Sequence, residues 1–139
     1  MQAKDIMSTN VTSCLPGTSL EQVARMMLDH DCGAIPVVDD AHEPIGVITD
    51  RDIVCRAVAE GKNPLDLLVV DCMTNEVDTV MPDTHLDECC EIMERAQVRR
   101  LIVIDDEGKC CGVISQADIA LKTNEHCTAE VLKEVSQPA

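Results

Sequence analysis

Apolar residues along the first half of the chain follow a helix period and then a strand pattern. From Thr18, the residues spaced as one helical face are Leu20, Val23, Ala24 and Met27, and Thr18-Ser19-Leu20-Glu21 offers a capping box at the start of that helix. Strands are predicted over 35–38 and 45–48, with an acidic turn at 39–40 between them. A second helix is expected to begin at Thr49-Asp50-Arg51-Asp52 and to end near Gly61.

The same order of elements recurs 66 residues later. A short extended segment near Val11 or Val77 ends at Pro16 or Pro82, because proline disfavours helix in the residue before it. The strongest matches at this offset are Met7 with Met73, Leu20 with Leu86, Val37 with Val103, Gly46-Val47-Ile48 with Gly112-Val113-Ile114, and Asp52-Ile53 with Asp118-Ile119. The second helix face is then formed by Leu86, Cys89, Cys90 and Met93.

The repeat predicts an α+β fold in which the order β-α-β-β-α occurs twice. Each copy is only marginally stable on its own, so we expect the two to pack face to face about a pseudo-twofold axis. The predicted boundaries are 1–64 for the first repeat with its N-terminal segment, 65–122 for the second repeat, and 123–139 for a C-terminal tail helix.

The charge and the motif content of the chain argue against several classes of function. The 139 residues carry a formal net charge of −15, which repels nucleic acid and anionic lipid, and no apolar run is long enough to span a bilayer. We therefore expect a cytoplasmic protein with neither nucleic acid nor membrane as a partner. Sequence motifs of a nucleophile elbow, a phosphate-binding glycine loop or a zinc protease are absent, so an enzyme is not expected.

The opening Asp-Ile-Met or Cys-Met-Thr, the strand with its paired acidic turn, and Gly-Val-Ile-Thr/Ser-x-x-Asp-Ile resemble the CBS domain. The pair, covering roughly residues 5 to 122, resembles a stand-alone Bateman module and is similar to small bacterial proteins of the hypoxic response protein type. The resemblance implies a regulatory module that binds AMP, ADP, ATP or S-adenosylmethionine in clefts between the repeats. It also implies a homodimer and an unidentified regulated protein as partners, with no certain cofactor and no metal site.

The resemblance also assigns candidate ligand-binding residues. The first cleft would be formed by Thr12, Ser13, Cys32, Gly33, Ala34, Arg100, Ser115 and Asp118. The second would be formed by Thr49, Asp52, Val77, Thr79, Val98 and Arg99. The two aspartates would accept hydrogen bonds from ribose hydroxyls, and the arginines would bind phosphate through two donors. Gly33 and Ala34 occupy the positions of Arg99 and Arg100, so the first cleft, which Arg100 completes, is the favoured one.

The same residues can also be explained without a ligand. Thr49-x-x-Asp52 and Ser115-x-x-Asp118 are also capping boxes, and Arg99-Arg100 can be solvated or paired with the abundant carboxylates. Cys89-Cys90 suits core packing, while Cys110-Cys111 at a strand start should point one side chain inward and the other outward.

The nine cysteines support an alternative function, a thiol-responsive or metal-responsive CBS pair without a nucleotide. A purely structural dimer is a further alternative. Neither cysteine pair has the spacing of a structural zinc site, and most cysteines are expected to be reduced.

Overall fold

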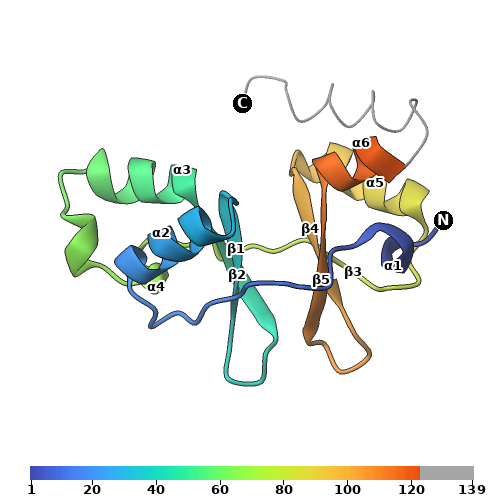
Figure 1. Cartoon of the computed structure of the whole chain (residues 1–139), viewed down its shortest axis with the longest axis horizontal. Helices are drawn as coiled ribbons and strands as arrows, with labels where there is room; N and C mark the ends of the chain where they lie inside the picture. Colours follow the sequence, from blue (N-terminus) through green and yellow to red (C-terminus); the bar gives the residue numbers. More distant parts are fainter. Residues whose placement is uncertain (123–139) are drawn as a thin grey trace. The chain divides into compact units, whose positions relative to one another are not determined.

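A computed structural model of the chain describes residues 1–122, and the predicted tail helix at 123–139 lies outside the described residues (Figure 1). The chain forms two compact units, one built from Thr12–Val77 and the other from Met1–Val11 together with the chain from Asp78 onward. We call them the Asp52 unit and the Asp118 unit, after the aspartate that each contains near the start of a helix.

The Asp52 unit contains a two-stranded antiparallel sheet and four short helices. Strand β1 (Ala34–Val38) pairs with β2 (Pro44–Thr49), and an isolated parallel bridge joins Cys14 to Val37. Helix α2 (Leu20–Asp29) precedes the sheet, and α3 (Asp50–Ile53) follows it and runs into a π-helical turn, η1 (Val54–Val58). A 3-10 helix, η2 (Pro64–Asp66), and α4 (Val69–Cys72) complete the unit.

The Asp118 unit repeats this plan with a third strand. Strand β3 (Thr79–Val80) is parallel to β4 (Arg100–Ile104), which pairs antiparallel with β5 (Cys110–Ser115). Helix α5 (Leu86–Ala96) precedes β4, α6 (Gln116–Lys122) follows β5, and α1 (Ala3–Ile6) comes from the chain start. The structure therefore has the predicted α+β composition in two related halves.

The opening segment of each repeat packs on the core of the other repeat. In the Asp118 unit, Ser8 pairs with Val113 of β5, and the backbone N–H of Ala3 donates to the carbonyl of Thr84 at 2.8 Å. In the Asp52 unit, Thr74 pairs with Val47 of β2 through two backbone hydrogen bonds of 2.9 Å. The two sequence repeats thus exchange their opening segments, and each compact unit contains the opening segment of the other repeat.

Glycine makes this close pairing possible. A Cβ atom on Gly46 would lie 2.6 Å from the backbone oxygen of Thr74, a separation that real Cβ atoms do not tolerate. At the corresponding Gly112, a Cβ atom would lie 2.6 Å from the Met7 sulfur. The recurring Gly-Val-Ile motif therefore serves the packing of the exchanged segments.

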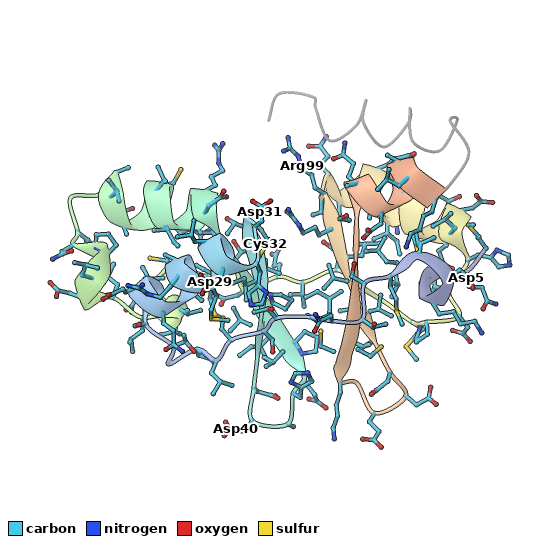
Figure 2. All side chains as sticks on the ribbon, viewed as in Figure 1. Asp5, Asp29, Asp31, Cys32, Asp40 and Arg99 are labelled. Carbon is cyan, nitrogen blue, oxygen red and sulfur yellow. The ribbon has the colours of Figure 1, made fainter. Side chains whose placement is uncertain are left out.

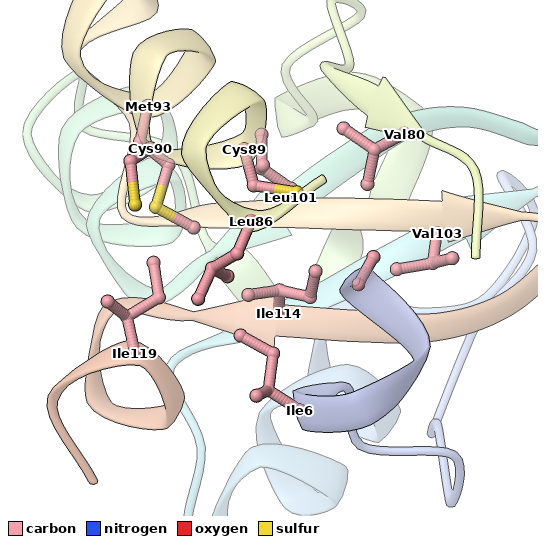
Figure 3. Close-up of a cluster of buried hydrophobic side chains, with 11 residues drawn as sticks. Ile6, Val80, Leu86, Cys89, Cys90, Met93, Leu101, Val103, Ile114 and Ile119 are labelled. Carbon is pink, nitrogen blue, oxygen red and sulfur yellow. The ribbon is translucent and has the colours of Figure 1, made fainter. Parts of the chain in front are cut away.

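Each unit has its own aliphatic core, and no aromatic residue contributes to either. Figure 3 shows the core of the Asp118 unit, where Ile6, Leu101, Ile114 and Ile119 are fully buried around Met93 and Cys89. The predicted inward face of α5 is confirmed, since Leu86, Cys89, Cys90 and Met93 are all buried. Cys110 is buried and Cys111 only partly, as the strand alternation predicts.

Some local predictions were wrong. The N-cap of α2 is Ser19, whose side chain accepts from the N–H of Gln22, while the Thr18 hydroxyl accepts from Leu15. Ala24 is exposed, because the narrow stripe of α2 that faces the core contains only Leu20, Val23 and Met27. The sequence also did not indicate α1, α4 or the π-helical turn.

Candidate functional site

Both Thr/Ser-x-x-Asp motifs form complete capping boxes at helix starts. The N–H of Thr49 donates to Asp52 Oδ2 at 3.0 Å, and the N–H of Asp52 donates back to Thr49 Oγ1 at 3.0 Å. The matching distances between Ser115 and Asp118 are 2.9 and 3.1 Å. The plain capping interpretation is thus confirmed, and it uses one oxygen of each carboxylate, so a second role depends on the other oxygen.

Strand register brings further predicted residues to each motif. Ala34 lies opposite Thr49 in the β1-β2 pair, and the carbonyl of Gly33 accepts from the N–H of Asp50 at 2.9 Å. In the Asp118 unit, Arg100 lies opposite Ser115. The carbonyl of Arg99 accepts from the N–H of Gln116 at 2.9 Å.

The remaining predicted residues divide between the same two units. The predicted residues of the Asp52 unit are Thr12, Ser13, Cys32, Gly33, Ala34, Thr49, Asp52 and Val77. Those of the Asp118 unit are Thr79, Val98, Arg99, Arg100, Ser115 and Asp118. Figure 2 shows Cys32 in the turn before β1 and Arg99 just before β4. In each unit the predicted residues at one strand start lie beside the helix start, whereas Thr12 and Ser13 precede Cys14, which pairs with Val37 inside β1.

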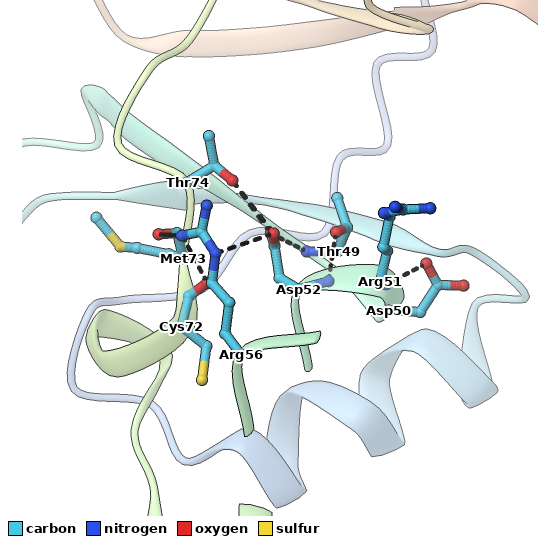
Figure 4. A network of polar contacts seen from close by, with 8 residues as sticks. All are labelled: Thr49, Asp50, Arg51, Asp52, Arg56, Cys72, Met73 and Thr74. Atoms are coloured by element: carbon cyan, nitrogen blue, oxygen red, sulfur yellow. Dashed lines mark hydrogen bonds and ion pairs between the residues drawn. The ribbon is translucent and has the colours of Figure 1, made fainter. Parts of the chain in front are cut away.

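Asp52 has contacts beyond its cap, as Figure 4 shows. The Thr74 hydroxyl donates toward Asp52 Oδ1 at 3.3 Å and Oδ2 at 3.4 Å, and Arg56 Nε lies 3.9 Å from Oδ1. The Arg56 guanidinium is in turn anchored, because its Nη1 donates to the carbonyl oxygens of Met73 at 2.8 Å and Cys72 at 3.3 Å. Both carboxylate oxygens of Asp52 therefore already have partners, and its side chain is only 12% exposed.

Sequence reasoning missed Arg56 and Thr74, although the repeat contained a signal for both. At the 66-residue offset Thr74 aligns with Ser8 and Arg56 with Lys122, so each copy keeps a hydroxyl and a cation at these positions. Their significance depends on the exchange of opening segments, which brings residue 74 beside Asp52.

Asp118 lacks the corresponding contacts. Among residues 1–122, its carboxylate accepts only the N–H of Ser115, and neither Ser8 nor Lys122 donates to it. One carboxylate oxygen of Asp118 is thus without a partner in the described part of the chain, and the residue is partly exposed.

Charge distinguishes the two units as well. Arg99 and Arg100 are exposed, and within the described residues their guanidinium groups form no ion pair, contrary to the alternative that they pair with carboxylates. At the corresponding place in the Asp52 unit, Asp50 Oδ2 would lie 2.9 Å from a Cβ atom on Gly33. The Asp118 unit thus offers free cations where the Asp52 unit offers a carboxylate.

Among residues 1–122 seven cysteines are free, and four of these are buried: Cys14, Cys72, Cys89 and Cys110. Burial raises the pKa of Cys14 and of Cys89 to about 11, which keeps both protonated at neutral pH. Cys90 is buried as well and is disulfide-bonded. Across residues 1–122 no three His, Cys, Asp or Glu side chains come together in a way that could hold a metal ion.

The sequence model of the CBS domain family matches residues 3–58 and 69–123. The chain belongs to the CBS domain family. Its two matches coincide with the two repeats, which confirms the resemblance. No helix within the described range is long and apolar enough to span a bilayer.

Relatives of the same size and fold exist. Hypoxic response protein 1 of Mycobacterium tuberculosis is 33% identical over 136 residues, which are 98% of this chain and 94% of that protein. A crystal structure of Hypoxic Response Protein I with two coordinated zinc ions has a TM-score of 0.80 at 31% identity, covering 89% of this chain and 100% of that one.

A second solved structure contains nucleoside ligands. The CBS domain pair of protein MJ0100, in complex with 5′-methylthioadenosine and S-adenosyl-L-methionine, has a TM-score of 0.78 at 26% identity. The match covers 87% of this chain and 98% of that chain. CBS pairs of this kind are regulatory, non-catalytic modules, and this neighbour binds adenine-containing ligands.

Proposed function

We propose that the protein is a non-catalytic regulatory module that binds an adenine-containing nucleotide and thereby changes the surface it offers to a regulated protein. The observation that carries the proposal is the carboxylate oxygen of Asp118 that has no partner among residues 1–122, in the unit where Arg99 and Arg100 form no ion pair with the same residues. The adenosine ligands of the MJ0100 pair support the same ligand class. Ligand binding can shift the equilibrium between two arrangements of the module only by the difference in binding free energy to them. That coupling is about 1–3 kcal/mol.

The Asp118 unit can recognise the sugar and the charged end of such a ligand. A carboxylate oxygen without a partner accepts a hydrogen bond from a ribose hydroxyl, and the Ser115 hydroxyl lies in the same capping box. Arg100 stands opposite Ser115 in the sheet, where its guanidinium can bind a phosphate through two donors. The contribution of Thr12, Ser13, Cys32, Gly33 and Ala34 to the binding of the adenine stays a prediction.

The second proposed site is centred on Thr49 and Asp52, and the contribution of Val77, Thr79, Val98 and Arg99 to it stays a prediction. The overall charge of −15 favours a ligand of low negative charge. AMP or the cationic S-adenosylmethionine is therefore a better candidate than ATP for the protein as a whole.

The composition offers a direct test. The protein has no Trp and no Tyr, so it absorbs little near the ultraviolet maximum of adenine. We expect an absorbance scan of the protein dialysed against AMP to show retained nucleotide, with a dialysed aromatic-free control polypeptide showing none. A scan identical to that of buffer-dialysed protein, over AMP concentrations up to the millimolar range, would contradict the proposed function.

A homodimer is proposed as the assembly. Val54 and Val58 are 57% and 56% exposed and lie one helical turn apart, which leaves an apolar stripe on α3 and η1 without a partner among residues 1–122. Light scattering coupled to size exclusion should give twice the mass of the chain. The double variant Val54→Asp with Val58→Asp should give the monomer mass, and an unchanged mass would contradict the use of this stripe.

A zinc-responsive or thiol-responsive module is the second candidate, and the zinc-bound Hypoxic Response Protein I structure is the observation that favours it. The described residues supply no metal cluster and mostly protonated, buried thiols, so the nucleotide proposal is preferred. Elemental analysis of the purified protein together with a thiol count before and after mild oxidation distinguishes the two. Stoichiometric zinc or a loss of thiols would support this second candidate.

A further inference from the structure

The partners of Asp52 occupy the atoms that a ribose would need. A ribose offers two neighbouring hydroxyl donors, and a carboxylate accepts their hydrogen bonds with the lone pairs that the capping box leaves free. At Asp52 the Thr74 hydroxyl is already shared between Oδ1 and Oδ2, at 3.3 and 3.4 Å. A ribose that reached Asp52 would therefore have to displace that hydroxyl first.

Arg56 reinforces this occupancy. Its guanidinium is fixed by the carbonyl oxygens of Cys72 and Met73 and keeps Nε 3.9 Å from Asp52 Oδ1. Thr74 is likewise fixed, because its backbone pairs in both directions with Val47 of β2. Displacing the two donors from Asp52 would therefore turn the Thr74 side chain to another rotamer and would strain or break the hydrogen bonds of Arg56 to Cys72 and Met73.

The other unit has the same residue types without these contacts. Ser8 and Lys122 stand where Thr74 and Arg56 stand, and Ser8 has the same backbone pairing, with Val113. Within residues 1–122 neither side chain donates to Asp118. The two aspartates therefore differ in their side-chain partners, while their capping boxes are alike.

We infer that Thr74, supported by Arg56, is a specificity-determining residue that acts as an internal substitute for the ribose at Asp52, so that adenosine-type ligands fill the Asp118 site first. This inference rests on the proposed function. It assigns the protein one strong site and one self-occupied site, at which a second ligand must displace the Thr74 hydroxyl.

Calorimetric titration of the full chain with adenosine tests the inference, because adenosine has the ribose but no phosphate. The natural chain should bind one equivalent tightly. Thr74→Val keeps the shape of the side chain but removes its donor, so it should strengthen the second binding event about tenfold, the value of one hydrogen bond to a charged group. Thr74→Ser, which restores a hydroxyl, should return the natural behaviour.

Ser8→Ala is the matched control, because it removes the corresponding hydroxyl from the Asp118 unit, where no contact is lost. It should leave both binding events unchanged. Two equal sites in the natural chain, or a second event that Thr74→Val leaves unchanged, would overturn the inference while leaving the proposed function intact. If Thr74→Val does not fold, the titration of the natural chain alone tests the inference, because two equal sites would overturn it. No adenosine or AMP binding by any variant would overturn the proposed function itself.

Discussion

The Asp52 unit and the Asp118 unit share a plan in detail, down to a register shift after Val37 in one and after Val103 in the other. They differ in what surrounds the aspartate. Asp52 has Thr74 and Arg56 as neighbours and Asp50 close by, whereas one oxygen of Asp118 has no partner among residues 1–122. The two units thus share the scaffold and the helix caps, while the side-chain partners of the two aspartates differ.

This comparison separates structural from functional residues. The capping boxes, the Gly-Val-Ile motifs and the exchanged segments occur in both units because each unit needs them to fold. Arg99 and Arg100 stand where the other copy has Gly33 and Ala34. The close approach of Asp50 gives Gly33 a structural reason, so Arg100 against Ala34 is the difference that points to binding.

The largest effect is expected from the exchanged segments. Ile6→Ala should destabilise the protein by about 2–5 kcal/mol, because Ile6 is fully buried in the core of the Asp118 unit. Its counterpart Cys72 is smaller, so Cys72→Ala should cost only about 1 kcal/mol. Hydrogen exchange should show the loss of protection from Ile6→Ala in β4 and β5, and a loss confined to β1 and β2 would contradict the exchange.

The next largest effect is expected from the glycines of the two Gly-Val-Ile motifs. Gly46→Ala should destabilise the protein by about 1–3 kcal/mol, because the new Cβ meets the backbone oxygen of Thr74. Gly112→Ala should cost less, since the atom nearest to its Cβ belongs to the flexible side chain of Met7. Denaturant unfolding measures both, with Gly17→Ala as the control because nothing lies within 4 Å of its Cβ. Equal costs for Gly46→Ala and Gly17→Ala would contradict the close pairing.

Alkaline pH should weaken both units similarly, since each contains a buried thiol whose pKa is raised to about 11. Cys14 and Cys89 ionise at about 11 in the folded protein and at 9.0 when unfolded. The unfolded state therefore releases these protons first, so the stabilisation is complete below pH 9.0 and is lost as the pH rises toward about 11. The expected loss is about 1–3 kcal/mol per thiol.

Unfolding free energies measured across that pH range provide the check. Replacing Cys14 and Cys89 by Ala should lower stability at neutral pH but flatten its alkaline decline. A decline as steep as that of the natural chain would show that other groups cause it.

A smaller effect is expected at the arginines. Arg100→Gln should weaken AMP binding about tenfold and leave adenosine binding unchanged, because the guanidinium contacts only the phosphate. Titrations with both ligands measure this. Equal weakening for AMP and adenosine would show that Arg100 supports the fold of the site and does not bind the phosphate.

Much of the fold could be predicted because the 66-residue repeat fixes the order of elements twice. Continuous apolar runs predicted β1 and β4, and Gly61, with φ of 77°, marks the end of the helical region after Asp52. The exchange of opening segments could not be predicted, because both copies present the same pattern and a segment such as Ala3–Ile6 matches either core equally well. Four-residue helices such as α1 and α4 also show no full helical period.

The candidate site was predictable only in part. Thr/Ser-x-x-Asp and Arg99-Arg100 are visible in the sequence, and strand register then places Arg100 opposite Ser115. The partners of Asp52 were not visible, because Thr74 lies 22 residues away along the chain and reaches the carboxylate only through the exchanged segment.

One titration tests the central claim most directly, which is that Asp118 binds the ribose of an adenine nucleotide. Asp118→Ala should weaken AMP binding at least tenfold, because it removes the charged carboxylate that accepts a hydrogen bond from the ribose. Asp5→Ala is the matched control, since Asp5 Oδ2 accepts the N–H of Gln2 in a capping box of the same unit. The account predicts that Asp5→Ala binds AMP like the natural chain, and equal AMP affinity for Asp118→Ala and the natural chain would contradict it.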